Sequence, residues 1–146
     1  MKKFVLDCSV TMTWCFEDEA TESAEDSLAL LKEMTAIVPP IWSIEVMNVL
    51  RVAERKNRIN ISSADHFIRF LNTLPIILDS GLNHFLNTSI LAISRKHSLS
   101  AYDAAYLEIA LRYNIPLISF DKNLCAAAKK EGMALLSTEP QSLPFV

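Results

Sequence analysis

The sequence predicts an α/β fold, in which a five-stranded, mostly parallel sheet lies between two layers of helices as a three-layer α/β/α sandwich. Short apolar runs alternate with longer segments of helical periodicity, and such alternation is typical of a sheet covered on both faces. The chain has 146 residues, of which 51% are hydrophobic. This length and composition fit one compact domain, which we expect to span residues 1–146.

The five strands are predicted from short apolar runs, most of which are bounded by residues that end strands. They are expected at residues 4–6, 36–38, 75–79, 117–120 and 133–136. Pro39 and Pro40 stop the second run. The first and fourth runs lead directly into Asp7 and Asp121.

The helices are predicted from apolar periodicity and from residues that commonly begin or end helices. They are expected at residues 10–16, 19–34, 44–57, 62–74, 84–97, 100–113 and 123–131. Ser43 is expected to cap the third of these, and Ser62 or Ser63 the fourth. Gly132 is expected to end the last.

Composition excludes several classes of protein. The net charge of −3 and the pI of about 5.6 argue against a large cationic surface that holds nucleic acid. With only Gly81 and Gly132, neither a dinucleotide-binding fingerprint nor a phosphate-binding P-loop can be built. No apolar run approaches the roughly 20 residues that cross a bilayer. Three scattered cysteines form no metal or disulfide pattern, so we expect a cytoplasmic protein without membrane contact.

Four acids are expected to meet beyond the carboxyl ends of the strands, where α/β folds bind ligands. Asp7 and Asp121 follow the first and fourth strands, while Glu45 and Asp103 lie in the first turns of two helices. Two carboxylates about 5 Å apart repel by roughly 3 kcal/mol at an effective dielectric of about 20. The cluster therefore predicts raised pKa values or a bound divalent cation, and oxygen ligands favour Mg²⁺ or Mn²⁺.

Each acid also has a structural interpretation that the residues alone leave open. Asp7 and Asp121 are placed to cap the helices that follow their strands. Asp103 comes three residues after Ser100, which is the spacing of a capping box. Glu45 shares a helix face with apolar residues, where an acid needs a partner, a metal or contact with water. The roles are compatible, because a helix dipole keeps a nearby acid ionised.

Four segments resemble the four motifs of the PIN-domain family, and most closely those of the VapC toxins of toxin–antitoxin pairs. They are VLDCSV at residues 5–10 followed by Trp14, SIEVMNVL at 43–50, LSAYDAAYL at 99–107 and PLISFDKNL at 116–124. They occur in the family's order and cover nearly the whole chain. The resemblance implies an α/β/α sandwich with a five-stranded parallel sheet and metal-dependent endonucleolytic hydrolysis of RNA.

The resemblance also implies roles for particular residues. The catalytic and metal-binding acids correspond by position to Asp7, Glu45, Asp103 and the more variable Asp121. Ser9 and Asn48 match polar positions often found beside the acids. Ser119 stands where the family commonly has threonine, and it retains the hydroxyl. The implied cofactor is Mg²⁺ or Mn²⁺.

The partners implied by the resemblance are an RNA substrate, a small antitoxin protein whose tail lies over the active site, and a second copy in a homodimer. Lys122, Arg51 and Arg55 are candidates for phosphate contacts, although each could instead belong to a solvated helix face. Apolar residues in segments 28–34 and 44–52 could form a groove for an amphipathic partner helix, or could belong to the core.

Two other functions compete with the nuclease. One is a phosphohydrolase of the haloacid-dehalogenase type with Asp7 as nucleophile, but that chemistry usually needs a second aspartate two residues later, where this chain has Ser9. The other is a non-catalytic module of the same fold that binds RNA or protein through an inactive site. The presence of all four acids argues against it.

Overall fold

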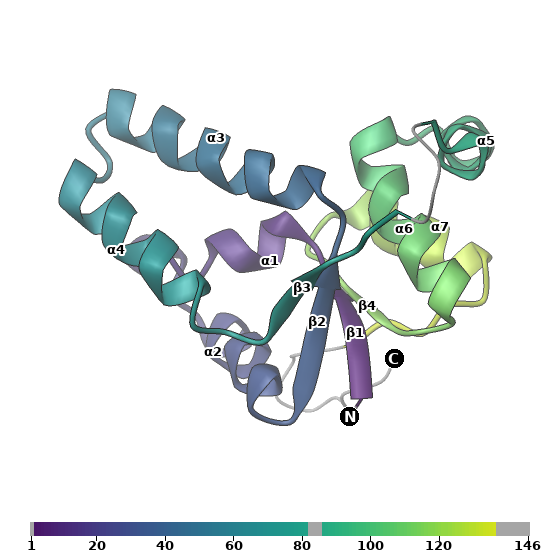
Figure 1. Ribbon diagram of the computed structural model, residues 1–146, viewed down its shortest axis with the longest axis horizontal. Coiled ribbons are helices and arrows are strands. Elements are labelled where there is room, and N and C mark those ends of the chain that lie inside the picture. Colours follow the sequence, from purple (N-terminus) through teal and green to yellow (C-terminus); the bar gives the residue numbers. More distant parts are fainter. Residues whose placement is uncertain (1, 82–85, 137–146) are drawn as a thin grey trace.

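The computed structural model describes residues 2–81 and 86–136, and its centre is a parallel sheet (Figure 1). The strands are β1 (Lys2–Leu6), β2 (Met34–Val38), β3 (Ile76–Leu78) and β4 (Leu117–Ile118), in the order β3-β2-β1-β4. Each neighbouring pair runs parallel. The α/β class and the parallel sheet predicted from the sequence are therefore confirmed.

The fifth predicted strand, residues 133–136, is reduced to one parallel bridge between Leu135 and Leu117. The N–H of Leu117 donates to the carbonyl of Ala134, and the N–H of Leu136 donates to the carbonyl of Leu117. Because β4 contributes only two residues to the sheet, it offers this segment little backbone to pair with. Within the described residues the sheet thus has four strands rather than five.

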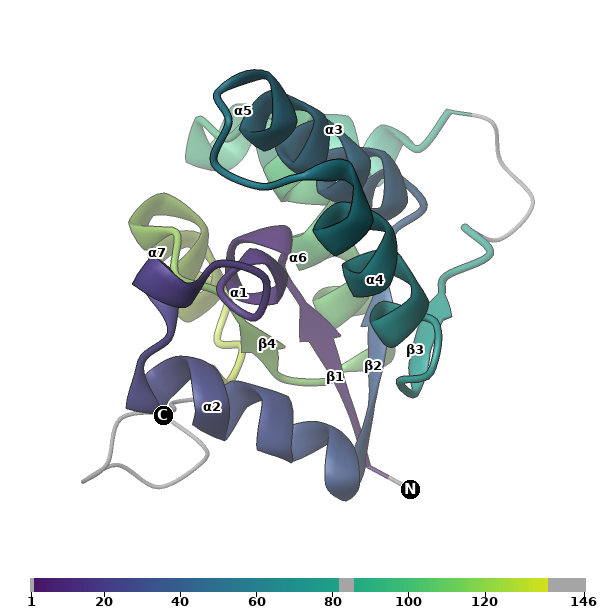
Figure 2. The ribbon, with the colours of Figure 1, turned by 90° about the vertical axis from the view of Figure 1, so that its left-hand side faces the viewer.

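Helices cover both faces of this sheet. They are α1 (Cys8–Met12), α2 (Glu22–Ala29), α3 (Ile41–Arg55), α4 (Ile61–Leu71), α5 (Thr88–His97), α6 (Ala101–Tyr113) and α7 (Lys122–Lys130), with 3₁₀ turns at Glu17–Glu19 and Leu30–Lys32. Figures 1 and 2 show α1, α2 and α4 on one side of the sheet and α6 and α7 on the other. In the described part of the chain, none of the helices has the length and hydropathy of a membrane span.

Two helix caps differ from the sequence prediction. Helix α3 starts upstream of Ser43, which lies inside its first turn, and Pro40 takes the N-cap position with a φ of −54°. The pyrrolidine ring fixes φ near the helical value, so the helix can begin there without a capping side chain. Asn60, rather than Ser62 or Ser63, caps α4, because its side chain accepts the N–H of Ser63 at 2.7 Å.

Several predicted helices have different bounds. The helix predicted at 10–16 is observed earlier, as α1 (Cys8–Met12). The segment 19–34 is divided, because Thr21 caps α2, a 3₁₀ turn follows it, and β2 already begins at Met34. The helix predicted at 84–97 is observed from residue 88 onward, after its cap Asn87. Residues 84 and 85 of that prediction lie outside the described residues.

The position of β1 determines where the site forms. Phe4, Val5 and Leu6 are fully buried in the middle of the sheet. Leu6 pairs with Ile118 of β4, so the residues that follow these two strands emerge side by side at the carboxyl edge of the sheet.

Candidate active site

Asp7 follows β1 directly and is the most buried of the four candidate acids, with 4% of its surface exposed. Two serine hydroxyls donate to its Oδ2 atom: that of Ser9 at 2.6 Å and that of Ser119 at 2.7 Å. Asp7 occupies the N-cap position of α1, but its side chain makes no capping hydrogen bond. The capping interpretation is therefore wrong for Asp7.

The two serines are themselves oriented by the backbone that follows β4. The Oγ of Ser9 accepts the N–H of Phe120 at 3.1 Å, and the Oγ of Ser119 accepts the N–H of Asp121 at 2.9 Å. Each hydroxyl therefore directs its proton to Asp7 while its lone pair is occupied. Ser9, Ser119 and Asp7 form one hydrogen-bonded unit across the ends of β1 and β4.

Asp121 and Asp103 lie at the first turns of two helices. The Oδ1 of Asp121 accepts the N–H of Leu124 at 2.9 Å, so the capping interpretation is correct for this residue. For α6 the capping side chain is that of Ser100, whose Oγ accepts the N–H of Asp103 at 3.1 Å. Both carboxyl groups are half-buried, at the helix ends where the dipole favours negative charge.

Glu45 lies in the second turn of α3 and is half-buried. The hydroxyl of Tyr106, a residue of α6, donates to its Oε1 at 2.5 Å. Tyr106 is the one residue of the site that the sequence analysis did not select. Its position three residues after Asp103 places it on the same face of the helix, and that spacing was the available signal.

The pKa values of three of these acids are raised, because the carboxyl groups are removed from water and face one another. Burial is the main cause of the raised pKa of Asp7; it outweighs the hydrogen bonds from the serines, and Asp121 adds to it. Burial also raises the pKa of Glu45, with further contributions from Asp7 and Asp103. The pKa of Asp103 is raised by burial, then by Asp121 and Asp7. Asp7 and Asp103 thus lie close enough to Glu45, and Asp121 lies close enough to Asp7 and Asp103, for their charges to interact.

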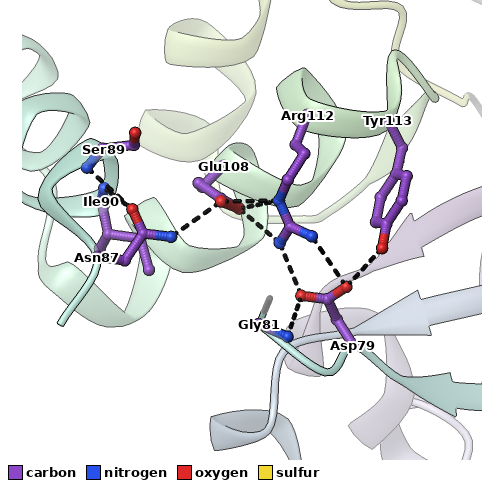
Figure 3. A network of polar contacts seen from close by, with 8 residues as sticks. All are labelled: Asp79, Gly81, Asn87, Ser89, Ile90, Glu108, Arg112 and Tyr113. Carbon is purple, nitrogen blue, oxygen red and sulfur yellow. Dashed lines mark hydrogen bonds and ion pairs between the residues drawn. The ribbon is translucent and has the colours of Figure 1, made fainter. Parts of the chain in front are cut away.

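No cation within residues 2–81 and 86–136 forms a salt bridge with any of the four acids. A second acidic pair in the molecule shows the contrast (Figure 3). There, Arg112 lies between Asp79 and Glu108, at 2.7 Å and 2.9 Å. Although burial pushes the pKa of Asp79 upward, hydrogen bonds from Arg112 and Tyr113 outweigh it and lower that pKa. The acids of the candidate site lack such compensation.

The donor set fits a hard divalent cation. Carboxylate oxygens are the ligands that Mg²⁺ and Mn²⁺ prefer, and uncompensated negative charge attracts such an ion. Among the described residues, no group of three or more Asp, Glu, His or Cys side chains is arranged so that it could hold a metal ion by itself. Any Mg²⁺ bound at this site would therefore need water molecules to complete its coordination, as is usual for this ion.

Cys8 adjoins this cluster without adding a reactive group. Burial, followed by the charges of Glu45 and Asp7, raises the pKa of its thiol to about 12. In the metal-free protein this raised pKa keeps the Cys8 thiol protonated at neutral pH, the form that is not nucleophilic.

The remaining candidates from the sequence lie on the surface. Asn48 is exposed on α3, and no side-chain hydrogen bond connects it to the acids in the described part of the chain. Arg51 and Arg55 are exposed on the same helix, where Arg51 contacts Glu54 at 3.4 Å. Lys122 is exposed at the start of α7, next to Asp121.

Comparison with known proteins identifies the family. The sequence model of the PIN-domain family matches residues 4–130 of this chain. The chain belongs to the PIN-domain family. The segments VLDCSV and PLISFDKNL contain the ends of β1 and β4, and Asp7 and Asp121 follow these strand ends.

Proteins similar to this PIN domain include a ribonuclease and solved structures of the same fold. Ribonuclease VapC1 of Mycobacterium tuberculosis is 30% identical over 98 residues, which cover 67% of this chain and 71% of that protein. PAE2754 from Pyrobaculum aerophilum has a TM-score of 0.63 at 17% identity, over 86% of each chain. VapBC2 from Rickettsia felis, solved with a DNA fragment of its promoter, has a TM-score of 0.57 at 11% identity, over 88% of this chain and 92% of that one. At these identities the solved structures show a shared PIN fold.

Proposed function

We propose that this PIN domain is a Mg²⁺- or Mn²⁺-dependent endoribonuclease, the toxin of a type II toxin–antitoxin pair. The observation that carries the proposal is the convergence of four carboxyl groups, without a compensating cation in the described residues, at the carboxyl edge of the sheet. The similarity to ribonuclease VapC1 supports RNA as the substrate. The haloacid-dehalogenase alternative lacks its second aspartate, because Ser9 stands at that position. The presence of all four acids argues against the inactive module.

The residues that would hold the ion are Asp7, Asp103 and Asp121, directly or through water, with Glu45 completing the shell. When bound, a divalent cation lowers the pKa of a coordinated water and offsets charge on the scissile phosphate. Ser9 and Ser119 hold the Asp7 carboxylate in one orientation through its Oδ2. Glu45 or Asp121 would accept the proton of the attacking water.

RNA carries its charge on phosphates, so it needs cations around an acidic site. Lys122 follows Asp121 directly and is exposed, so it is a candidate for contact with a phosphate at the site. Arg51 and Arg55 extend from α3 beyond Glu45 and could hold the phosphates of a longer RNA.

The proposed partners are a small antitoxin protein and a second copy of the chain. Structures of this fold include VapBC2 and a toxin–antitoxin complex from Klebsiella pneumoniae. The Klebsiella complex has a TM-score of 0.53 at 16% identity, over 80% of this chain and 85% of that one. Two apolar segments were candidates for the partner groove. Segment 28–34 buries Leu31 and Met34 in the core. Segment 44–52, which lies in α3, leaves Ile44 and Met47 with 56% and 48% of their surface exposed. The α3 surface, beside a pocket shared with α4, is therefore the proposed antitoxin contact. We place the activity in the cytoplasm, where the free thiols remain reduced.

Incubation with total RNA tests the proposal. The wild-type protein should cleave RNA with Mg²⁺ and not with EDTA, and Asp7→Asn should lose cleavage by at least about 100-fold. Asp65→Asn, the same change at an exposed residue of α4, is the matched control and should cleave like the wild type. Equal cleavage in EDTA, or by Asp7→Asn, would refute the metal-dependent nuclease and indicate contamination or another mechanism. Absence of cleavage under every condition would instead favour the non-catalytic module.

A further inference from the structure

We propose that Tyr106 is a positioning residue, which fixes the Glu45 carboxylate so that one of its oxygens remains available to a divalent cation. This inference rests on the proposed function, because it assigns to Tyr106 the orientation of a proposed metal ligand. It goes beyond the four acids, since Tyr106 is neither charged nor a ligand itself.

The geometry places the phenol where it can act on Glu45. Tyr106 is fully buried, and its hydroxyl donates to Oε1 of Glu45 at 2.5 Å, between residues that are 61 positions apart. Tyr106 follows Asp103 by three residues, so both lie on the same face of α6. That face therefore carries one acid, Asp103, and the hydrogen-bond donor to another acid, Glu45. The bond thus ties α3 to the helix that carries Asp103.

Glu45 depends on such a hydrogen bond for its orientation more than the other acids do. A glutamate side chain has three rotatable bonds, and Asp7 and Asp103 both repel this one, so without the hydroxyl it would turn toward water. The phenol occupies Oε1, while Oε2 has no hydrogen-bond partner among the described residues. The orientation of the carboxylate is therefore set before any ion arrives.

The neutral hydroxyl of Tyr106, as the donor, also points to metal binding rather than to stability alone. Asp7 is held in the same way, by the neutral hydroxyls of Ser9 and Ser119 on one oxygen. An arginine would hold a carboxylate more strongly, as Arg112 holds Asp79, but it would cancel the charge that attracts a cation. Hydroxyl donors orient the two acids and leave their negative charge in place.

Calorimetric titration of the RNA-free protein with Mn²⁺ tests the inference. Tyr106→Phe should weaken Mn²⁺ binding by about tenfold, the lower end of what loss of a ligand-orienting hydrogen bond causes. Tyr113→Phe is the matched control, because it removes the same kind of bond, from a tyrosine hydroxyl to Asp79 at 2.9 Å, on the same helix. Tyr113→Phe should leave Mn²⁺ binding unchanged. In a Glu45→Gln background, Tyr106→Phe should have no further effect, since the phenol acts through that carboxylate.

A spectroscopic measurement on the wild-type chain covers the case in which Tyr106→Phe does not fold. With tyrosine labelled by ¹³C at Cζ, the Tyr106 signal should shift when Mg²⁺ is added, because the ion polarises its acceptor Glu45. The Tyr113 signal in the same spectrum should not move, and Glu45→Gln should abolish the Tyr106 shift.

The outcomes separate the two proposals. If the wild-type protein binds Mn²⁺ and cleaves RNA while Tyr106→Phe binds equally well, or while Tyr113→Phe is weakened as much, only the role of Tyr106 is refuted. A Tyr106 signal that Mg²⁺ leaves unchanged in a protein that binds the ion refutes it too. If the wild-type protein binds no Mn²⁺ and leaves RNA intact, the proposed function fails together with this inference.

Discussion

Replacement of Arg112 by methionine should strongly destabilise the fold, because the guanidinium group is the shared partner of two buried acids (Figure 3). Its Nη2 lies 2.7 Å from Asp79 Oδ2, and its Nε lies 2.9 Å from Glu108 Oε1. The side chains of these acids are only 3% and 8% exposed, and that of Arg112 is 19% exposed. Methionine keeps much of the volume and removes the charge.

The loss of stability can be estimated from the two buried acids that would remain without Arg112. At about 4 Å each ion pair is worth roughly 4 kcal/mol at an effective dielectric of about 20, and desolvation offsets much of this in the intact network. Without Arg112, two like charges remain buried without a cation. Removal of one partner from a buried ion pair typically costs about 3 to 5 kcal/mol. For a chain of this size, a loss of about 3 kcal/mol corresponds to a fall in melting temperature of roughly 6 to 12 °C.

The dependence on pH gives a second, sharper readout. In the wild type the pKa of Asp79 lies below its ordinary value of 3.8, so its contribution to stability is present at neutral pH and is lost as the pH falls below that value. Without Arg112, burial would dominate and raise this pKa, so ionisation of Asp79 would then oppose folding. The difference between wild type and Arg112→Met should therefore be largest at neutral pH and shrink on acidification.

Urea unfolding across this pH range measures both effects. Arg51→Met is the control, since the Arg51–Glu54 pair at 3.4 Å has an arginine that is 58% exposed, and such surface pairs contribute about 0 to 1 kcal/mol. Adding Asp79→Asn and Glu108→Gln to Arg112→Met should recover part of the loss, because no buried charge then remains. A loss no larger than that of Arg51→Met, or a difference that does not vary with pH, would refute the reasoning.

Three further changes test individual residues of the site. Mn²⁺ at about 100 times its dissociation constant should stabilise the wild type by roughly 2.7 kcal/mol, and thermal melting should show no such gain for Asp7→Asn. In urea unfolding, Asp121→Ala should cost about 1 kcal/mol through loss of the α7 cap, whereas Asp121→Asn should keep the cap and lose RNA cleavage. Ser119→Ala should weaken Mn²⁺ binding by about tenfold in calorimetry, whereas Ser119→Thr, which retains the hydroxyl, should not.

Much of the fold could be predicted because local signals and tertiary structure agree. The apolar run at residues 4–6 is followed by Asp7, and the structure places this run at the centre of the sheet. Ser100 and Asp121 cap the helices that the sequence assigned to them. Gly132 follows the last helix with a φ of +76°, a conformation that glycine adopts without strain.

The differences arise where two local signals compete or where the partner is distant in the chain. Ser43 is a good capping residue, but Pro40 fixes helical φ earlier and the helix starts there. Segment 133–136 has the composition of a strand, yet a strand also needs a neighbour, and β4 is too short to provide one. No pattern within residues 43–50 shows that Glu45 meets Tyr106, because that contact depends on how α3 and α6 are placed.

Helix α6 connects the stability of the fold with the proposed chemistry. Its first half carries Asp103 and Tyr106 into a cluster of acids that repel one another. Its second half carries Glu108 and Arg112, which bind the end of β3 through Asp79. Repulsion at one end would displace a loosely held helix, whereas ion pairs at the other end anchor it to the sheet. The polar network thus anchors α6 to the sheet, while the first half of the same helix carries acids that repel one another.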